Sequence, residues 1–135
     1  MNYFEQLKTR SGEIGSVVCV GLDPDFKKHT VETIASFNRA IIEATAPYAA
    51  CFKPNIAFYE QFGLEGLRAL EKTLEAIPSG IPVVGDVKRG DIGNTAEAYA
   101  RAMFEGWGFD AVTLSGYQGI DTVAPFLAYE GKAVY

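Results

Sequence analysis

The residues best suited to chemistry in this sequence are charged side chains that follow an apolar stretch. Asp86, Lys88 and Asp91 come shortly after the apolar residues 81–84. Side chains in a strand alternate between its two faces, so Asp86 and Lys88 point the same way if this stretch is a strand. Moving an ion out of water costs several kcal/mol, so such charges need partners. They either neutralise one another as part of the scaffold or are arranged for a reaction.

Two further charged residues occupy equivalent places after other apolar stretches. Lys53 ends the run 49–53, and Asp23 follows the run 17–21. Ligands of parallel α/β folds bind at the carboxyl ends of the strands. Taken singly, Asp23 could be a turn former, Lys53 a solvated lysine and Asp91 a helix cap. Core packing gives no reason to collect all five charges at one edge, so together they favour a functional site.

An array of lysines and aspartates in a partly buried place suits proton transfer. Neighbouring carboxylates raise the pKa of a lysine and fix its direction, so it acts as a proton donor rather than a nucleophile. A carboxylate beside the reacting carbon would also disfavour a negative substrate group and favour its loss. These residue types suggest proton chemistry at carbon, with decarboxylation among the candidates. They do not identify the substrate.

The elements that must position these residues alternate between strands and helices. Apolar runs predict strands over 17–21, 49–53, 81–87, 109–114 and 132–135. Helical spacing of apolar residues predicts helices over 30–47, 55–77 with a break near Gly63 and Gly66, 95–106 and 120–129. The strands recur about every thirty residues, the length of a βαβ unit. The predicted fold class is therefore α/β with parallel strands covered by helices.

Two α/β architectures fit this alternation, an open doubly wound sheet and a TIM (β/α)8 barrel. A complete barrel takes about 250 residues, whereas this chain has 135. The barrel therefore requires residues 1–135 to be the N-terminal half of a single domain. That half would supply about four βα units and the start of a fifth strand. A chain that stops within a predicted strand favours the half-barrel.

Composition narrows the partners and the compartment. The net charge is −5 and the basic residues are scattered, which argues against a nucleic-acid surface. No apolar run approaches the ~20 residues that cross a bilayer, and the N-terminus lacks the features of a signal peptide. A cytoplasmic protein without membrane contact is expected. Cys19 and Cys51 lie in apolar runs and are expected to be reduced core thiols.

Three segments give the sequence a family resemblance. Residues 86–95 (Asp-Val-Lys-Arg-Gly-Asp-Ile-Gly-Asn-Thr) resemble the signature of orotidine 5′-phosphate decarboxylase. Residues 21–25 and 52–60 resemble the longer branch of that family. The resemblance covers essentially the whole chain. It implies a (β/α)8 barrel, without cofactor or metal, that converts orotidine 5′-monophosphate to uridine 5′-monophosphate and carbon dioxide in pyrimidine nucleotide synthesis.

The resemblance also implies a role for each charged residue. Lys88 would protonate the pyrimidine carbon as carbon dioxide leaves, and Asp86 would lie against the departing carboxylate. Lys53 and Asp23 would hold the ribose hydroxyls and the charged array.

A homodimer with shared active sites is the further implication of the resemblance. Asp91, Ile92 and Thr95 would reach into the site of the partner subunit. The family's pyrimidine and phosphate contacts fall beyond strand five, so the 135-residue chain is expected to be inactive alone.

Two alternatives remain open. Magnesium-dependent sugar-phosphate decarboxylases and synthases of the same superfamily share the Asp-x-Lys-x-x-Asp element. They carry an acidic residue at the end of the second strand, where this chain has Lys53, and a lysine repels a divalent cation. An inactive fragment that serves only as an interaction module is the second alternative.

Overall fold

The computed structural model describes residues 1–135 and contains five short strands, each parallel to its neighbours. The strands are β1 (Val18–Gly21), β2 (Ala49–Lys53), β3 (Val84–Arg89), β4 (Ala111–Leu114) and β5 (Ala133–Val134). β1 pairs with β2, β3 with β4, and β4 with β5, while isolated parallel bridges join the β2 region to the β3 region. The strands thus follow one another in sequence order, as in a barrel and unlike a doubly wound sheet.

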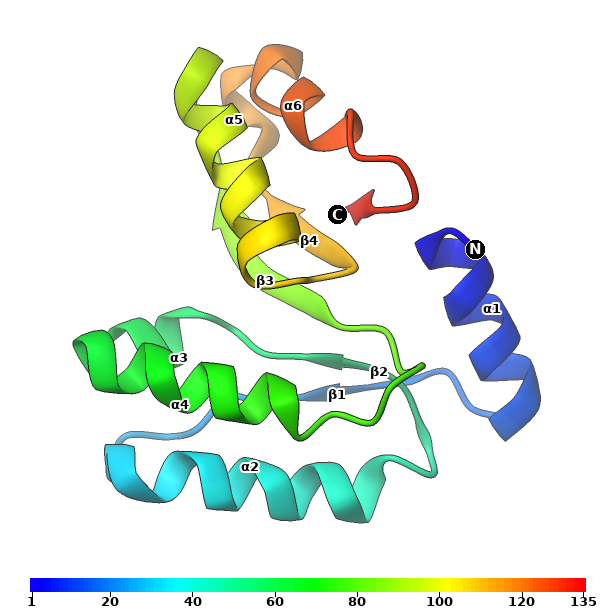
Figure 1. Cartoon of the computed structure of the whole chain (residues 1–135), viewed down its shortest axis with the longest axis vertical. Helices are drawn as coiled ribbons and strands as arrows, with labels where there is room; N and C mark the ends of the chain where they lie inside the picture. The colour runs from blue at the N-terminus through cyan, green and yellow to red at the C-terminus, as the bar shows by residue number, and fades with distance from the viewer.

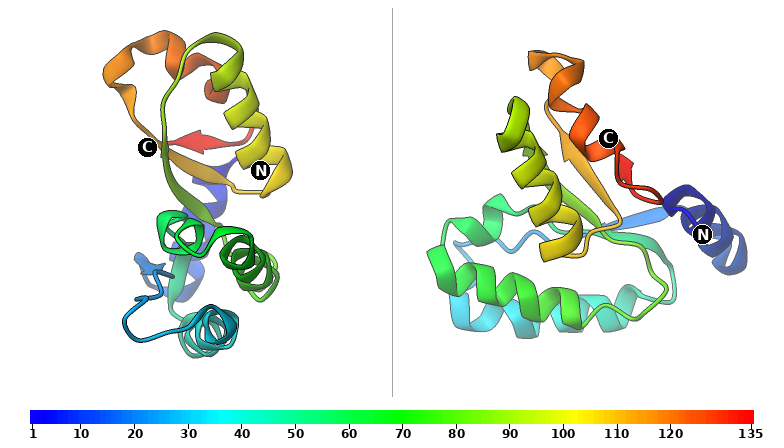
Figure 2. Two further views of the ribbon diagram at one scale, coloured as in Figure 1. Left: turned by 90° about the vertical axis from the view of Figure 1, so that its left-hand side faces the viewer. Right: turned by 45° about the horizontal axis from the view of Figure 1, so that its top comes forward.

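The helices that follow the strands cover one side of them, and one further helix precedes β1. They are α1 (Tyr3–Ile14), α2 (Val31–Thr45), α3 (Ala57–Glu60), α4 (Gly63–Glu75), α5 (Gly93–Arg101) and α6 (Ala124–Leu127). Figure 1 shows α2, α3 and α4 grouped with β1 and β2, and α5 and α6 grouped with β3 and β4. The views in Figure 2 show the same two groups meeting between β2 and β3. None of the helices combines the length and the apolar character needed to cross a membrane.

The predicted elements are present with shifted boundaries. The predicted helix 55–77 is divided into α3 and α4 at Gly63, whose φ of 60° lies in the left-handed region. A π-helical turn over 102–106 continues α5 to the predicted end. The predicted helix 120–129 is a 3-10 turn followed by the four-residue α6.

Helix α1 is an element that the apolar spacing did not predict. Its N-cap is Asn2, whose side chain accepts a hydrogen bond from the Glu5 amide at 2.9 Å. The Glu5 carboxylate accepts one from the Asn2 amide, also at 2.9 Å, which completes a capping box. The helix lies near the amino end of β2, where Arg10 donates to the carbonyls of Ala46, at the end of α2, and Ala49, the first residue of β2. The polar cap was the available sequence signal.

Side-chain alternation separates two packing faces of the strands. The larger core lies between one face of the strands and the helices. It includes Val87 and Val112 from the strands, and Ile34, Tyr59, Leu70, Phe104, Phe109 and Phe126 from the helices and loops. The other face, here called the inner face, carries Cys51, Val84, Ala111 and Ala133, packed against Tyr3 of α1. Lys53 follows Cys51 by two residues and Asp86 follows Val84 by two. Both charged residues therefore belong to the inner face.

The two cysteines differ in burial. Cys51 is buried, as expected, whereas Cys19 is exposed, and neither forms a disulfide. The expectation of a buried Cys19 is wrong because β1 pairs with β2 alone and lacks a neighbour on its other side.

Candidate active site

Asp86 is the centre of a charged cluster at the carboxyl end of β3. The residue is 8% exposed. Its Oδ2 accepts a hydrogen bond from Lys53 Nζ at 3.0 Å, and its Oδ1 accepts one from Lys88 Nζ at 2.5 Å. Thr113 Oγ1 donates to Oδ1 at 2.9 Å. The structure therefore unites Asp86, Lys88 and Lys53 around one carboxylate, as the shared strand edge predicted.

The charges in this cluster fix one another's protonation. Burial of Asp86 raises its pKa, but the hydrogen bonds from Lys88, Lys53 and Thr113 outweigh burial, and the net pKa lies below the ordinary value. Burial of Lys53 lowers its pKa, but the hydrogen bond and charge of Asp86 and the charge of Asp23 raise it above the ordinary value. Asp86 is thus ionised and Lys53 protonated at neutral pH.

The backbone at Lys88 departs from regular strand geometry. Its φ is 43°, the only positive φ in the chain outside glycine. The register between β3 and β4 shifts between Gly85 and Arg89, so Lys88 lies in an irregular stretch of the pairing. The Lys88 side chain is 65% exposed, while its Nζ contacts Asp86. An exposed ammonium beside a buried carboxylate is open to a ligand at this edge.

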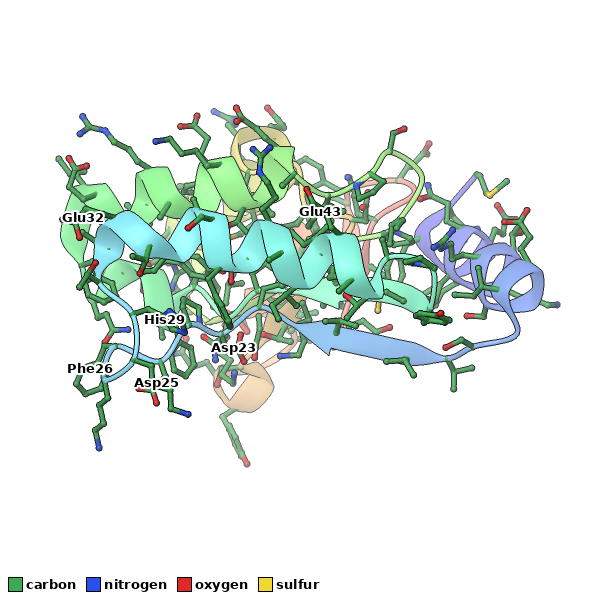
Figure 3. The ribbon with its side chains drawn as sticks, turned by 90° about the horizontal axis from the view of Figure 1, so that it is seen from below. Asp23, Asp25, Phe26, His29, Glu32 and Glu43 are labelled. Atoms are coloured by element: carbon green, nitrogen blue, oxygen red, sulfur yellow. The ribbon has the colours of Figure 1, made fainter.

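Asp23 lies at the same edge, in the loop between β1 and α2. Its Oδ1 accepts a hydrogen bond from the Asn55 amide at 3.0 Å, which joins the segments after β1 and β2. Figure 3 shows Asp23, Asp25 and His29 in this loop, at the end of the molecule away from α1. The side chain that stabilises the turn is that of Asp25, and not that of Asp23: Asp25 accepts a hydrogen bond from the Lys27 amide at 2.9 Å. Asp23 is exposed and close enough to influence Lys53.

Asp91, Ile92 and Thr95 are not joined to this cluster. The Asp91 carboxylate accepts a hydrogen bond only from the neighbouring Ile92 amide, at 2.8 Å. Helix α5 begins at Gly93 with Ile92 at its N-cap, so Asp91 does not cap the helix. Ile92 is 59% exposed and Thr95 is also exposed. Within this chain, Asp91 is half-exposed and none of the three residues contacts the cluster.

The contacts of two residues near the site, Thr113 and Arg89, were missed from the sequence. Thr113 of β4 hydrogen-bonds Asp86 across the strand pair. Arg89 Nη2 donates to Glu60 at 3.0 Å, and its guanidinium lies 5.2 Å from the centre of the Tyr99 ring. Thr113 gave no charge signal, since a β-branched residue in an apolar run reads as an ordinary strand former.

An apolar cavity of about 460 Å³ adjoins the cluster on the inner face. Lys53 and Thr113 line it together with Tyr3, Cys19 and Cys51. Its lining is largely apolar, so the polar chemistry is confined to the edge that carries Lys53 and Thr113.

Comparisons with known proteins agree with this arrangement. The model of the "Orotidine 5'-phosphate decarboxylase / HUMPS family" matches residues 16–133. The orotidine 5′-phosphate decarboxylase of Leptospira interrogans is 44% identical over 144 aligned residues, covering all of this chain and 52% of that protein. That of Phocaeicola vulgatus is 51% identical over 128 residues, covering 88% of this chain and 47% of that protein. The chain thus spans about half the length of these curated relatives.

Solved structures show the same relationship. The OMP decarboxylase of Leishmania donovani has a TM-score of 0.93 and 45% identity, over all of this chain and 52% of that chain. The UMP synthase of the same organism has a TM-score of 0.93 and 46% identity, over 29% of that chain. The OMP decarboxylase fold is a TIM barrel, so the predicted α/β half-barrel is confirmed. On the family match, the sequence identities and the shared fold, the chain belongs to the orotidine 5′-phosphate decarboxylase/HUMPS family.

Proposed function

We propose that this chain is the N-terminal half, residues 1–135, of an enzyme that decarboxylates orotidine 5′-monophosphate to uridine 5′-monophosphate. The observation that carries the proposal is the buried Asp86 carboxylate held between two ammonium groups, with Lys88 Nζ at 2.5 Å. Relatives named orotidine 5′-phosphate decarboxylase, at 44% and 51% identity, support the substrate.

The proposed chemistry uses Lys88 as the proton donor. The bond between the pyrimidine ring and its carboxylate breaks, carbon dioxide leaves, and the electron pair remains on the ring carbon. The Lys88 ammonium then supplies the proton that forms the new carbon–hydrogen bond, and the neutral amine regains a proton from water. Asp86 lies against the substrate carboxylate, and their repulsion is relieved as that group departs. Interactions that improve toward the transition state accelerate the reaction.

Lys53 and Asp23 are proposed to bind the ribose hydroxyls. The Lys53 ammonium can donate to a hydroxyl while it keeps its contact with Asp86. The exposed carboxylate of Asp23 can accept a hydrogen bond from a ribose hydroxyl.

A homodimer is proposed to complete the site. Asp91, Ile92 and Thr95 are exposed or half-exposed and stand apart from the Asp86 cluster of their own chain. In a dimer they would enter the partner's site, where Asp91 would add a second carboxylate. The free thiols of Cys19 and Cys51 are consistent with a cytoplasmic enzyme.

The magnesium-dependent alternative is less favoured. The Lys53 ammonium contacts Asp86 at 3.0 Å, where a divalent cation would have to displace it. We therefore propose a reaction without metal or cofactor. An interaction module alone would give no reason for a lysine in left-handed conformation whose ammonium contacts a buried carboxylate.

Substitution of Lys88 tests the proposal. The test uses the full-length enzyme, which includes the second half that the relatives have. Its activity is measured as the loss of orotidylate absorbance over time. Lys88→Ala should abolish turnover and partly keep the affinity for product. Removal of a group that moves a proton in the transition state costs at least about 10²-fold. The control is Lys8→Ala, an exposed residue of α1. Near-normal turnover by Lys88→Ala would refute the proton-donor role.

The 135-residue chain itself is proposed to be inactive. Binding energy from remote parts of a substrate drives the chemical step, and residues of the second half would provide the phosphate contacts. Loss of orotidylate absorbance with the purified chain would contradict this proposal.

A further inference from the structure

The Thr113 hydroxyl contacts three separate groups at the end of β3. It accepts hydrogen bonds from the backbone amides of Val87 and Lys88, each at 3.0 Å. It donates its own proton to Asp86 Oδ1 at 2.9 Å. A hydroxyl has one proton to donate and two lone pairs to accept with, so this group uses its full capacity here.

The irregular pairing of β3 explains why these amides need such a partner. Regular pairing with β4 is interrupted between Gly85 and Arg89 and resumes where Arg89 pairs with Leu114. Inside the interruption, the amides of Val87 and Lys88 point at Thr113 and not at a carbonyl of β4. Val87 is buried, and a buried amide without a partner is strongly disfavoured. One side-chain oxygen thus serves as the acceptor for two consecutive backbone amides.

The same oxygen connects the backbone of Lys88 to the carboxylate that Lys88 contacts. Lys88 has a φ of 43°, a conformation that residues with a Cβ rarely adopt and that the surroundings must maintain. The Lys88 ammonium and the Thr113 hydroxyl both donate to Asp86 Oδ1. Thr113 therefore binds both the backbone of Lys88 and the carboxylate of Asp86, and so fixes the position of one residue relative to the other.

We infer that Thr113 is a positioning residue for the reaction, which sets the Lys88 ammonium and the Asp86 carboxylate in their reactive arrangement through its hydroxyl. The inference rests on the proposed decarboxylation. Thr113 itself need not touch the substrate, so its loss should slow the chemical step more than it weakens binding. A strand residue with only a structural role would change stability and leave turnover per folded molecule unchanged.

Two substitutions in the full-length enzyme separate the hydroxyl from the shape of the side chain. Thr113→Val keeps the branched shape and removes the hydroxyl, whereas Thr113→Ser keeps the hydroxyl. Misplacement of reacting groups by about 1 Å can cost about 10²-fold in rate. Thr113→Val should therefore lower kcat about 100-fold and change KM less than about threefold. Thr113→Ser should keep both values within about threefold of wild type.

Thr73→Val is the matched control. The Thr73 hydroxyl in α4 accepts from Asn38 Nδ2 at 3.0 Å and donates to the Ala69 carbonyl at 2.8 Å. It is buried in the helical layer, away from the charged cluster. This variant should unfold at lower temperature and keep wild-type kcat.

Hydrogen exchange of the Val87 and Lys88 amides gives a readout independent of activity. Exchange at both amides should accelerate in Thr113→Val and remain slow in Thr113→Ser.

Wild-type kcat in folded Thr113→Val, or equal losses of kcat in both variants, would overturn the inference. If Thr113→Val does not fold, Thr113→Ser alone tests the inference. Fast exchange of the two amides in Thr113→Ser, or a kcat below a tenth of wild type, would overturn the inference. An inactive wild type would refute the proposed function instead, while exchange still tests the hydrogen bonds of Thr113.

Discussion

At the scale of single residues, the charge balance around Asp86 is the property most relevant to binding. One carboxylate contacts two ammonium groups, so this trio carries a net positive charge. Asp23 at the same edge balances the second ammonium, and the Lys88 side chain is the most exposed member of the trio. The exposed Lys88 ammonium can therefore contact an anionic group of a ligand at this edge, although the protein as a whole has a net charge of −5.

The pKa of Asp86 predicts how stability depends on pH. The folded-state pKa of Asp86 lies below its value in the unfolded chain, about 3.9. Its contribution to stability is therefore present above about pH 4 and is lost as the pH falls through the lower, folded-state pKa. Asp86→Asn in the full-length protein should be less stable than wild type by roughly 1–3 kcal/mol at pH 7. The difference should shrink toward pH 2, as measured by urea denaturation at both pH values.

Asp121→Asn provides the comparison for this prediction. Asp121 is exposed and forms no ion pair. Its variant should follow the wild-type pH dependence. An Asp86→Asn protein as stable as wild type at pH 7 would show that the cluster contributes nothing to folding.

At the scale of the elements, β3 is the strand on which the site depends. Its first half is regular and packed on both faces, and its second half is irregular around Lys88. Gly85 marks the packed half, because a Cβ at this position would lie 2.5 Å from Cδ2 of the Phe109 ring. The strand and the Phe109 ring approach so closely that only glycine fits between them.

Gly85→Ala should accordingly destabilise the protein. Overpacking a core position costs typically about 1–3 kcal/mol, and here the added methyl group meets atoms of the rigid Phe109 ring. Thermal or urea denaturation measures the loss, and the second substitution Phe109→Leu should restore part of it.

Gly12→Ala is the control for this strand substitution. A Cβ at Gly12, in α1, meets nothing within 4 Å, so alanine there should stabilise the helix by roughly 0.5–1 kcal/mol. Equal stability of Gly85→Ala and wild type would mean that Phe109 moves aside without cost.

The sequence predicted the strands, their parallel order and the shared edge, because periodicity and charge placement are local signals. Alternation also predicted that Asp86 and Lys88 point the same way, although the contact is made through an irregular backbone at Lys88. Thr113 was missed since its role depends on the register between β3 and β4, which no local pattern encodes. Helix α1 was missed because its signal lies in the capping residues and not in apolar spacing.

At the scale of the whole molecule, the separation of Asp91 from the Asp86 cluster leads to a test of the proposed dimer. A cyclic dimer places the same surface of each subunit against the other. If Asp91 acts in the partner's site, a mixed dimer of Lys88→Ala and Asp91→Ala subunits has one site with both changes and one with neither. Random mixing makes half the dimers mixed, so activity should recover to about a quarter of wild type.

Subunit exchange must be confirmed for this experiment, for example with two distinguishable tags. The homodimers of each variant, measured separately, provide the baseline. Persistent inactivity after confirmed exchange would place Asp91 in the site of its own subunit, since every site would then carry one change.

The position of α1 has a consequence for how the protein is made. Strands that follow one another in sequence order can add to the growing sheet as they leave the ribosome. Helix α1 is synthesised before these strands, yet the Tyr3 amide donates to the Gly131 carbonyl at 2.8 Å, and the Tyr3 hydroxyl lies 2.9 Å from that of Tyr135. These contacts cannot form until the fifth strand emerges. Helix α1 is therefore translated before the strands β1–β5 but reaches its final place only after they have all emerged.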